Sequence, residues 1–486
     1  MGLLIGDIVS QATRMAPNAV ASTLDGTAVT FAELDVRGNR TANALAGLGV
    51  RHGDRVAWWV SPTLRTLDGF LACARLGAAL VPINPGLPPA EVAAVLDYLE
   101  PRLLVTDVEH DASLGLPTTV LGGDLDGRCA AASGRAPDGS ERVCDADPHI
   151  VYLTSGSTGR PKGVLVSHRA SWLRAAPGGG TFTSGLRGSG VVCSFPLYHY
   201  GGWHYVLEAW QNRTAAHLVR RADAGSLIEA VQRWRPSALY CIPAVWERLL
   251  DAEHRHADLS CLYHADTGTS GVSADLLARI KERLPGTRTT VLYGSTEAGR
   301  MAALPDWDLA RKPGSVGLPA FPGALWVDGS GEVCVRSEAL MSGYHNLPDE
   351  TAAALRDGEY RSGDLGYLDG DGYLYLTGRR REVIRTGGES VAPSEVEDAL
   401  RDLSGVRDIA VVGLPDARWG EVVCAVLVLL PGAVAPEVST VRAHVTSRLA
   451  GFKQPRRVVV IGEIPRTAAT GQIQRSRIRD ELLSRG

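Results

Sequence analysis

A dense set of hydrogen-bond donors occupies residues 154–163. They read Thr-Ser-Gly-Ser-Thr-Gly-Arg-Pro-Lys-Gly and follow the apolar run 150–153. Glycines let backbone amides approach an anion, the hydroxyls add donors, and Lys162 adds a positive charge. The segment therefore predicts a loop that holds a polyphosphate, with a polar surface turn as the simpler alternative. It is not a Walker loop, because Pro161 stands where that motif needs glycine.

This segment resembles the phosphate loop of the adenylate-forming superfamily, which includes acyl-CoA synthetases, luciferases and peptide-synthetase adenylation domains. Three further segments match motifs of that superfamily in the same order: residues 293–298 (Tyr-Gly-Ser-Thr-Glu-Ala), residues 361–364 (Arg-Ser-Gly-Asp) and residues 378–379 (Gly-Arg). The resemblance covers nearly the whole chain and is strongest to acyl- or aryl-CoA ligases. It implies an AMP-forming ligase that uses ATP and Mg²⁺.

The resemblance implies a role for each matched residue. Tyr293 would stack on adenine, and Thr296 would bind the α-phosphate. Glu297 would hold Mg²⁺, which commonly binds one or two carboxylates together with substrate phosphates. Asp364 would accept both ribose hydroxyls, with Arg379 as a nearby cation. Taken singly, each residue could equally be a core residue or part of a surface ion pair. The implied nucleotide- and CoA-binding set is Thr154, Ser155, Gly156, Ser157, Thr158, Gly159, Lys162, Gly268, Thr269, Tyr293, Gly294, Asp364, Arg379 and Gly388.

Two segments concern the carboxylic acid that a ligase of this superfamily would activate. Residues 196–202 resemble the Pro-Leu-Phe-His-x-Gly-Gly stretch of CoA ligases, in which the histidine, here His199, lies between the acid pocket and the thiol tunnel. A packed core histidine is the alternative. Residues 264–273, which contain Thr-Gly-Thr-Ser-Gly at 267–271, replace the family's Gly-Gly-Ala-Pro-Leu loop, and their polarity indicates a polar ring substituent. We expect the acid to be selected near His199, Trp203, His264 and Gly294.

The nature of the acid and of its acceptor also follows from local sequence. Pro196, rather than an aspartate, follows Phe195, which argues against an α-amino-acid activator. Four methionines and six phenylalanines are few for a long apolar tunnel and favour an aromatic or short acid. Residues 386–391 resemble the Gly-Gly-Glu-Asn-Val strand that lines the pantetheine tunnel of CoA ligases, and residues 450–455 resemble their Gly-Tyr-Lys-x-Pro. Both favour CoA over a carrier protein as the acceptor.

Gln472 is the main departure from the family pattern. Residues 465–475 resemble the segment that brings the adenylation lysine into the active site, but they have one extra residue before the glycine and glutamine in place of lysine. A neutral amide cannot neutralise the charge that builds up at the α-phosphate. Three explanations stay open: an engineered substitution, a different attacking anion such as nitrite for diazotisation of an aryl amine, or a nucleotide-binding protein with weak or no turnover.

The elements that must position these residues have an α/β pattern. Short β-branched or apolar runs (150–153, 238–242, 289–293 and 409–412) alternate with helical patterns (91–99 and 227–234). Such alternation favours helix-covered sheets. Ser394 and Glu397 have capping-box spacing and predict a helix start.

We expect three parts in the chain. Residues 1–377 form a large AMP-binding domain of helix-covered sheets plus a small β-barrel-like part. Residues 378–382 form a hinge, in which Arg381 stands where relatives carry Asp or Lys. Residues 383–486 form a small mobile α+β domain.

Composition excludes several other classes of protein. Fifty Lys and Arg against 54 Asp and Glu give a formal net charge of -4, so neither nucleic acid nor an anionic membrane is an expected partner. The longest apolar run, residues 422–430, is about half of the roughly 20 residues a membrane helix needs. The eight cysteines lie at least 15 residues apart, which suggests neither a zinc knuckle nor a disulfide framework. With no expected export or anchoring signal, we predict a cytoplasmic enzyme.

Overall fold

The computed structural model describes residues 2–107, 115–155, 161–176, 190–254, 256–320, 323–467 and 470–485. The chain forms two compact units. The first unit contains Met1–Ala324 and Val335–Tyr360, and the second contains Leu325–Cys334 and Arg361–Gly486. No helix of the described residues is long and apolar enough to cross a membrane.

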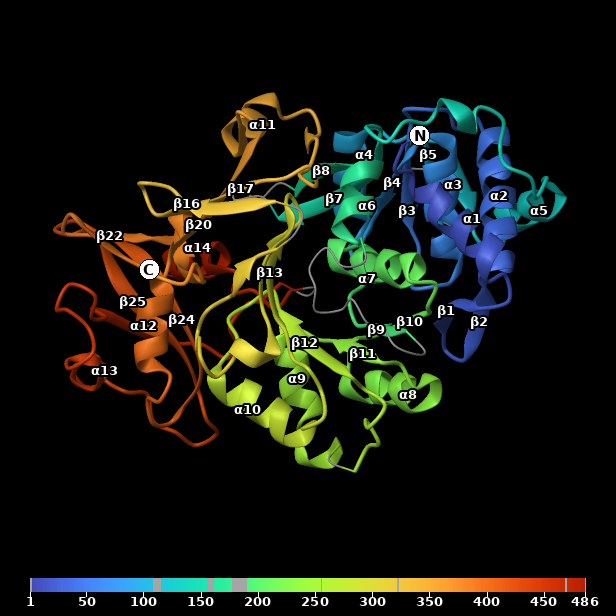
Figure 1. Cartoon of the computed structure of the whole chain (residues 1–486). Coiled ribbons are helices and arrows are strands. Elements are labelled where there is room, and N and C mark those ends of the chain that lie inside the picture. The colour runs from blue at the N-terminus through green and yellow to red at the C-terminus, as the bar shows by residue number, and fades with distance from the viewer. Residues whose placement is uncertain are drawn as a thin grey trace. The chain divides into compact units, whose positions relative to one another are not determined.

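A nine-stranded sheet forms one layer of the first unit (Figure 1). Its six inner strands, from β13 to β1, run parallel, whereas the strands at its edges pair antiparallel. In spatial order the strands are β15 (Leu318–Pro319), β14 (Gly299–Leu304), β13 (Val291–Ser295), β12 (His264–Gly268), β11 (Ala238–Tyr240), β9 (Val191–Cys193), β10 (Ala216–Leu218), β1 (Val20–Leu24) and β2 (Thr27–Thr30).

A seven-stranded sheet forms a second layer of this unit. Strands β7, β4, β3, β5 and β6 are parallel, and β8 turns back antiparallel to β7. In spatial order the strands are β18 (Gly343–Tyr344), β8 (Pro161–Ser167), β7 (Pro148–Ser155), β4 (Ala79–Pro82), β3 (Arg55–Trp59), β5 (Leu103–Thr106) and β6 (Thr118–Val120).

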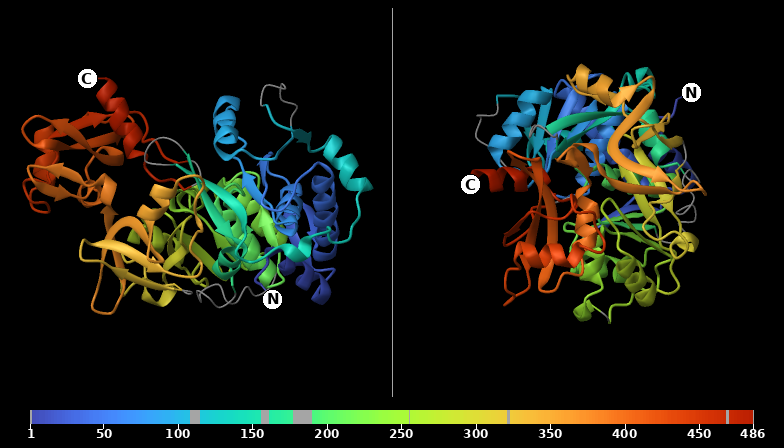
Figure 2. Two further views of the ribbon diagram at one scale, coloured as in Figure 1. Left: turned by 90° about the horizontal axis from the view of Figure 1, so that it is seen from above. Right: turned by 90° about the vertical axis from the view of Figure 1, so that its left-hand side faces the viewer.

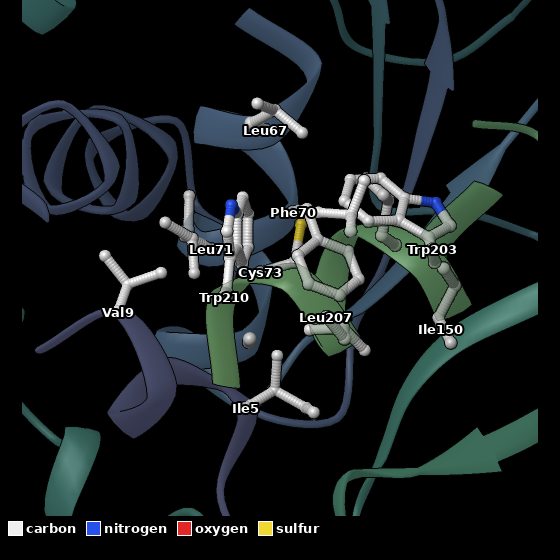
Figure 3. Packing of buried hydrophobic residues seen from close by; sticks show 14 of the residues in the cluster. Ile5, Val9, Leu67, Phe70, Leu71, Cys73, Ile150, Trp203, Leu207 and Trp210 are labelled. Carbon is white, nitrogen blue, oxygen red and sulfur yellow. The ribbon is translucent and has the colours of Figure 1, made fainter. Parts of the chain in front are cut away.

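Helices cover both sheets, and the largest core joins α1, α2, α3 and α7 to strands of both. Phe70 of α3 stacks on Trp203 of α7 with ring centroids 3.8 Å apart, and Trp210 lies beside them (Figure 3). Helices α8 to α10 pack on the other face of the nine-stranded sheet, and α4 packs on the other face of the seven-stranded sheet. The helices are α1 (Ile5–Met15), α2 (Phe31–Gly47), α3 (Arg65–Leu76), α4 (Pro89–Leu99), α5 (Asp124–Ala131), α6 (His168–Arg174), α7 (Tyr200–Gln211), α8 (Ala224–Trp234), α9 (Pro243–Leu249), α10 (Ala274–Arg283) and α11 (Pro348–Ala354), with 3₁₀ turns at Ser140–Arg142, Ala252–His254 and Asp306–Asp308.

Strand β20 (Glu359–Leu368) begins in the first unit, where it pairs with β19 (Leu355–Arg356), and continues in the second, where it pairs with β21 (Leu374–Arg379). The second unit also has a five-stranded sheet in which α12 and α13 pack on one face and α14 on the other (orange to red in Figures 1 and 2). The remaining elements of this region are β16 (Ala324–Val327), β17 (Glu332–Arg336), a 3₁₀ turn at Arg380–Glu382, β22 (Ile384–Thr386), β23 (Glu389–Val391), α12 (Pro393–Leu400), β24 (Val406–Asp416), β25 (Gly420–Leu429), α13 (Val438–Val445), β26 (Arg457–Val460) and α14 (Arg475–Ser484).

The predicted α/β class is confirmed, and the expected runs and helices fall within or overlap observed elements. The predicted capping box is wrong in its chemistry. Helix α12 does start nearby, at Pro393, but its N-cap Ala392 has no side-chain hydrogen bond. Ser394 donates to the Thr377 carbonyl at 2.8 Å instead, and Glu397 accepts from the Val411 amide at 2.8 Å. The second unit combines Leu325–Cys334 with the chain from Arg361 onwards. The hinge at residues 378–382 and the domain bounds on either side of it stay predictions.

Candidate active site

The two ends of the predicted phosphate loop lie side by side. Strands β7 and β8 form an antiparallel pair in which Thr154 faces Lys162. The Thr154 hydroxyl donates to the Lys162 carbonyl at 3.4 Å. Gly156, Ser157, Thr158 and Gly159 lie outside the described residues, as does the side chain of Ser155. The described ends therefore show how the loop is anchored to the sheet.

Lys162 is connected to Glu297 through an aromatic ring. Its ammonium lies 4.9 Å from the centroid of the Tyr344 ring, and the Tyr344 hydroxyl donates to Oε1 of Glu297 at 3.0 Å. Tyr344 lies in β18, which pairs with β8. A cation and a carboxylate, distant in sequence, are thereby held around one tyrosine.

Arg174, at the end of α6, holds the turn between β13 and β14. Its buried guanidinium donates to the carbonyl oxygens of Thr296 (3.0 Å), Glu297 (2.8 Å) and Ala339 (2.8 Å). The Glu297 carbonyl also accepts from the Met341 amide at 2.7 Å. Because these bonds involve backbone oxygens, they fix the turn and leave the Thr296 and Glu297 side chains available for other contacts.

Two glycines at neighbouring strand ends allow close backbone approach. A side chain at Gly268 would begin 2.1 Å from the Leu292 carbonyl oxygen, and one at Gly294 would begin 2.2 Å from that of Gly299. Strands β12 and β13 pair in parallel here, with Gly268 opposite Leu292, so Thr269 and Tyr293 follow at one sheet edge. The structure thus brings together four residues of the predicted nucleotide set.

His199 caps the N-terminus of α7. Its Nδ1 accepts from the Gly201 amide at 3.1 Å, and its ring stacks on Phe195 with centroids 5.3 Å apart. Burial lowers the pKa of His199 to about 4. The imidazole is therefore neutral near pH 7 and carries its proton on Nε2. Trp203, which we expected near the acid, packs in the core against Phe70 instead.

In the second unit, Asp364 and Arg379 face each other across the β20–β21 hairpin. Nε of Arg379 lies 3.1 Å from Oδ1 of Asp364. The Asp364 amide donates to the Ser362 hydroxyl at 3.0 Å. Gly388 lies in the tight turn between β22 and β23, with φ +87°. The two ribose-site residues predicted from separate motifs are thus direct neighbours.

Gln472 lies in a closed loop of the second unit. The backbone N–H of Gln472 donates to the Thr467 hydroxyl at 3.0 Å, and its backbone carbonyl accepts from the backbone N–H of Thr467 at 2.8 Å. Arg466 donates to the Gly471 carbonyl at 3.1 Å and holds both carboxylate oxygens of Asp408. Both of these contacts involve backbone atoms of Gln472, so they do not depend on which side chain residue 472 carries.

Comparison with known proteins agrees with this geometry. The family model described as AMP-binding enzyme matches residues 9–345, and that of the AMP-binding enzyme C-terminal domain matches residues 395–470. The chain belongs to the AMP-binding enzyme family. This AMP-binding enzyme is 34% identical to a feruloyl-CoA synthase of Amycolatopsis sp. over 96% of both chains. It is 32% identical to an indoleacetate–CoA ligase of Aromatoleum aromaticum over 94% of both.

A solved structure of an anthranilate CoA ligase in complex with anthranoyl-AMP has a TM-score of 0.87 and 25% identity to this AMP-binding enzyme. The match covers 100% of this chain and 99% of that one. An o-succinylbenzoate CoA synthetase of Bacillus subtilis in complex with ATP and a magnesium ion has a TM-score of 0.86 and 25% identity, over 97% and 99% of the two chains. The predicted class, an AMP-forming ligase of the acid–CoA ligase type, is confirmed.

The described residues of this AMP-binding enzyme fit a magnesium ion only if the substrate phosphates supply some of its ligands. They contain no cluster of three or more His, Cys, Asp or Glu side chains that could hold a metal. Glu297 offers one carboxylate, of which Oε1 accepts a hydrogen bond from Tyr344. Mg²⁺ keeps several waters and commonly takes one or two carboxylates plus substrate phosphates. A single carboxylate beside the phosphate loop suits that mode.

Tyr344 and Arg174 were missed by sequence reasoning. Neither belongs to a motif that we recognised, and both act through contacts with residues far along the chain. A lone tyrosine or arginine has no spacing signal of its own. The signal that exists is indirect, because a turn that displays Thr296 and Glu297 needs donors for its carbonyl groups.

Proposed function

We propose that this enzyme activates a small aromatic carboxylic acid with ATP, releases pyrophosphate, and then transfers the acyl group to CoA. The observation that carries the proposal is the contact chain from Lys162 through Tyr344 to Glu297. It joins the ammonium that we propose for the phosphates to the carboxylate that we propose for magnesium, with one tyrosine between them. The aromatic acids in the names of the relatives support the choice of substrate class.

The first step needs positioning and charge neutralisation more than proton transfer. A carboxylate oxygen of the acid attacks the α-phosphorus, and the bond to pyrophosphate breaks. Lys162 offsets phosphate charge, and Thr296 orients the α-phosphate from a turn that Arg174 holds rigid. Magnesium bound through Glu297 would supply further positive charge to the phosphates. No general base is required, which agrees with a neutral His199.

In the second step the CoA thiolate attacks the acyl carbonyl carbon, and AMP leaves. His199 carries its imidazole proton on Nε2 and is suited to donate a hydrogen bond rather than to take a proton. Asp364 would hold the ribose, and Gly388 would line the pantetheine path. Residues 378–382 would act as the hinge between an AMP-binding domain (1–377) and a mobile domain (383–486).

Acid-dependent exchange of labelled pyrophosphate into ATP tests the proposal. We expect exchange with at least one member of a panel of benzoic, cinnamic and arylacetic acids, in the wild type and more strongly in Gln472→Lys. Addition of CoA should then yield a thioester, whereas a carrier protein should not replace it. Silence of both proteins with every acid would reject the proposal.

One observation favours a second candidate function, namely the neutral Gln472 in a loop that would otherwise present a lysine. An anion other than a carboxylate, such as nitrite, would then be adenylated and would diazotise an aryl amine. Nitrite-dependent AMP release, followed by coupling of the product to a dye, would support this reaction. Nucleotide binding by calorimetry without AMP release with any anion would instead select a protein with weak or no turnover.

A further inference from the structure

A largely buried polar cluster, which we call the Arg300 cluster, lies next to the β13–β14 turn that carries Thr296 and Glu297. It consists of Arg300 from β14 and of Tyr200, His204 and Glu208 from α7. One guanidinium nitrogen of Arg300 contacts Nε2 of His204 at 2.6 Å, and the Tyr200 hydroxyl lies 3.4 Å from Nδ1 of His204. Side chains of four polar types are thereby gathered in a region where polar groups need partners.

Arg300 has donors to spare. In the described part of the chain, the guanidinium of Arg300 makes one hydrogen bond, to His204. No carboxylate oxygen of the described residues lies within 4 Å of this guanidinium. A guanidinium has five N–H donors. Burial opposes its charge, but Glu208 and the nearby tyrosines raise the pKa of Arg300 above its ordinary value. Within the described residues, Arg300 is thus a cation that uses one of its five N–H donors in a hydrogen bond.

His204 orients Arg300 and adds no charge. Burial, and then Arg300 itself, hold the pKa of His204 well below its ordinary value. Since Nε2 accepts from Arg300, the neutral ring carries its proton on Nδ1, where it faces the Tyr200 hydroxyl. Glu208 approaches the same Nε2 at 3.7 Å. These contacts hold the guanidinium through one of its terminal nitrogens, and no second hydrogen bond to it is found among the described residues.

Arg300 lies in the hairpin whose turn carries Thr296 and Glu297. Arg300 pairs with Gly294 across the β13–β14 hairpin and follows Glu297 by three residues. The Tyr200 ring lies 5.1 Å from the Arg174 guanidinium that holds this turn. His204 and Glu208 expose only 6% and 7% of their side chains, whereas Tyr200 and Arg300 keep more accessible surface. Tyr200 and Arg300 are therefore the members of the cluster that a ligand could reach.

Aromatic rings from α7 and from the neighbouring strands contact the Arg300 cluster and one another. Tyr205 packs on His204 with centroids 5.0 Å apart and on Tyr240 at 5.1 Å, and Tyr240 stacks on Phe195 at 5.1 Å. His199 stacks on the same Phe195. A series of contacting rings, of which Phe195, Tyr240 and Tyr205 are buried, thus leads from His199, expected beside the acid, to the Arg300 cluster.

We propose that Arg300, positioned by His204, donates hydrogen bonds to an oxygen atom on the ring of the aromatic acid. This inference rests on the proposed function and narrows its substrate class to aryl acids that carry a hydroxyl or a second carboxylate. Both groups offer an oxygen acceptor to the guanidinium fork. An amino group bound to a ring is a poor acceptor, and a methyl group offers none.

Binding of stable adenylate mimics tests the proposal without relying on turnover, which Gln472 could slow. The probes are N-acyl sulfamoyl adenosines of cinnamic acid whose ring carries hydrogen, methyl, amino, hydroxyl or carboxylate, with each substituent at the meta or the para position. Calorimetry on the full-length enzyme gives each Kd. We expect the best hydroxyl or carboxylate mimic to bind about 10- to 100-fold more tightly than its methyl counterpart.

Variants then assign the preference to the Arg300 cluster. Arg300→Lys keeps the charge but loses the fork, and His204→Asn removes the imidazole that orients it; each should reduce the preference to about threefold or less. Tyr263→Phe, which deletes a tyrosine hydroxyl elsewhere in the first unit, should keep it. Thermal unfolding of each variant shows whether it folds, and His204→Asn still tests the cluster if Arg300→Lys does not fold.

The outcomes separate this inference from the proposed function. If the methyl mimic binds as tightly as every oxygen-bearing mimic, or if the preference survives both substitutions, the role of Arg300 is overturned and the proposed function stands. If no aryl mimic binds although ATP does, the proposed function fails and the inference fails with it. A preference confined to the carboxylate mimics identifies a diacid substrate, and one confined to the hydroxyl mimics identifies a phenolic acid; both support the role of Arg300.

Discussion

At the scale of single residues, Gln472 sets the rate that we expect for adenylation. An ammonium at this position would offset the charge that builds up between the carboxylate and the α-phosphate, which a neutral amide cannot do. One such donor is typically worth on the order of 10² to 10³ in rate. We therefore expect Gln472→Lys to increase the rate of acid-dependent pyrophosphate exchange by that factor.

A matched control separates a positioned charge from an added one. Gln474→Lys adds the same ammonium two residues away, at the N-cap of α14, and should leave the exchange rate within about twofold. Equal acceleration by both variants would show a general electrostatic effect. No acceleration by Gln472→Lys with any acid would contradict the role of this position and favour nitrite as the attacking anion.

Tyr344 is a second residue whose role can be measured. Tyr344→Phe keeps the ring beside Lys162 but removes the hydroxyl that donates to Glu297 at 3.0 Å. A hydrogen bond to a charged group contributes about 1.5–3 kcal/mol. Without it Glu297 loses its orientation, and we expect the magnesium concentration for half-maximal exchange to rise about fivefold or more. An unchanged magnesium dependence would separate Tyr344 from the metal site.

At the scale of elements, Arg475 ties α14 to the rest of the second unit. Its guanidinium pairs with Glu382 and Glu397 at 2.7 Å each, and its Nε donates to the Val411 carbonyl at 3.2 Å. Only 16–19% of each of the three charged side chains is exposed. Loss of one partner of an ion pair buried to this degree leaves the others poorly compensated. We expect Arg475→Met to lower the free energy of unfolding by about 2–4 kcal/mol.

Urea denaturation monitored in the full chain measures this effect. Arg477→Met is the control, because Arg477 forms an exposed ion pair with Glu481 on the same helix. Such surface pairs contribute less than about 1 kcal/mol. If the two variants were equally stable, the paired carboxylates would not anchor α14.

Elements also show where sequence reasoning succeeds and where it stops. Hydrophobic periodicity predicts α4 and α8 because each buries one face against a sheet. The same reasoning finds the start of α12 but assigns the wrong cap. Glu397 has the spacing of a capping residue, yet Arg475, 78 residues later, takes its carboxylate instead. Local rules do not include such a partner.

At the scale of the whole molecule, motifs identify the parts of the candidate site that consist of contiguous residues. The turn with Thr296 and Glu297 and the Asp364–Arg379 pair are of this kind, since neighbouring residues or one hairpin bring them together. The contact of Arg300 with His204 joins residues 96 apart in the chain. This contact arises only because α7 packs against the nine-stranded sheet, so no residue spacing in the sequence predicts it.

The same packing makes stability depend on pH. Among the described histidines, burial lowers the pKa most at five, to about 4 for His168, His199 and His264 and well below the ordinary value for His149 and His204. The unfolded chain binds protons at these sites below about pH 6.5. Their contribution is therefore complete above pH 6.5 and is lost as the pH falls towards 4. Asp68 and Asp266 act in the opposite direction, because burial raises their pKa to about 6 and about 7, which favours the folded state at lower pH.

Five imidazoles outweigh two carboxyl groups, so the folded state binds fewer protons than the unfolded state between pH 6.5 and pH 5. We expect the Tm to fall by on the order of 5 °C from pH 7 to pH 5. Calorimetry at both values in buffers of equal ionic strength measures the shift. Proton uptake on unfolding at pH 5.5 should exceed that at pH 7.5, which ties the shift to the histidines rather than to salt. A Tm that rises towards pH 5 would mean that Asp68 and Asp266 dominate, and that the five rings are less isolated from water than their packing indicates.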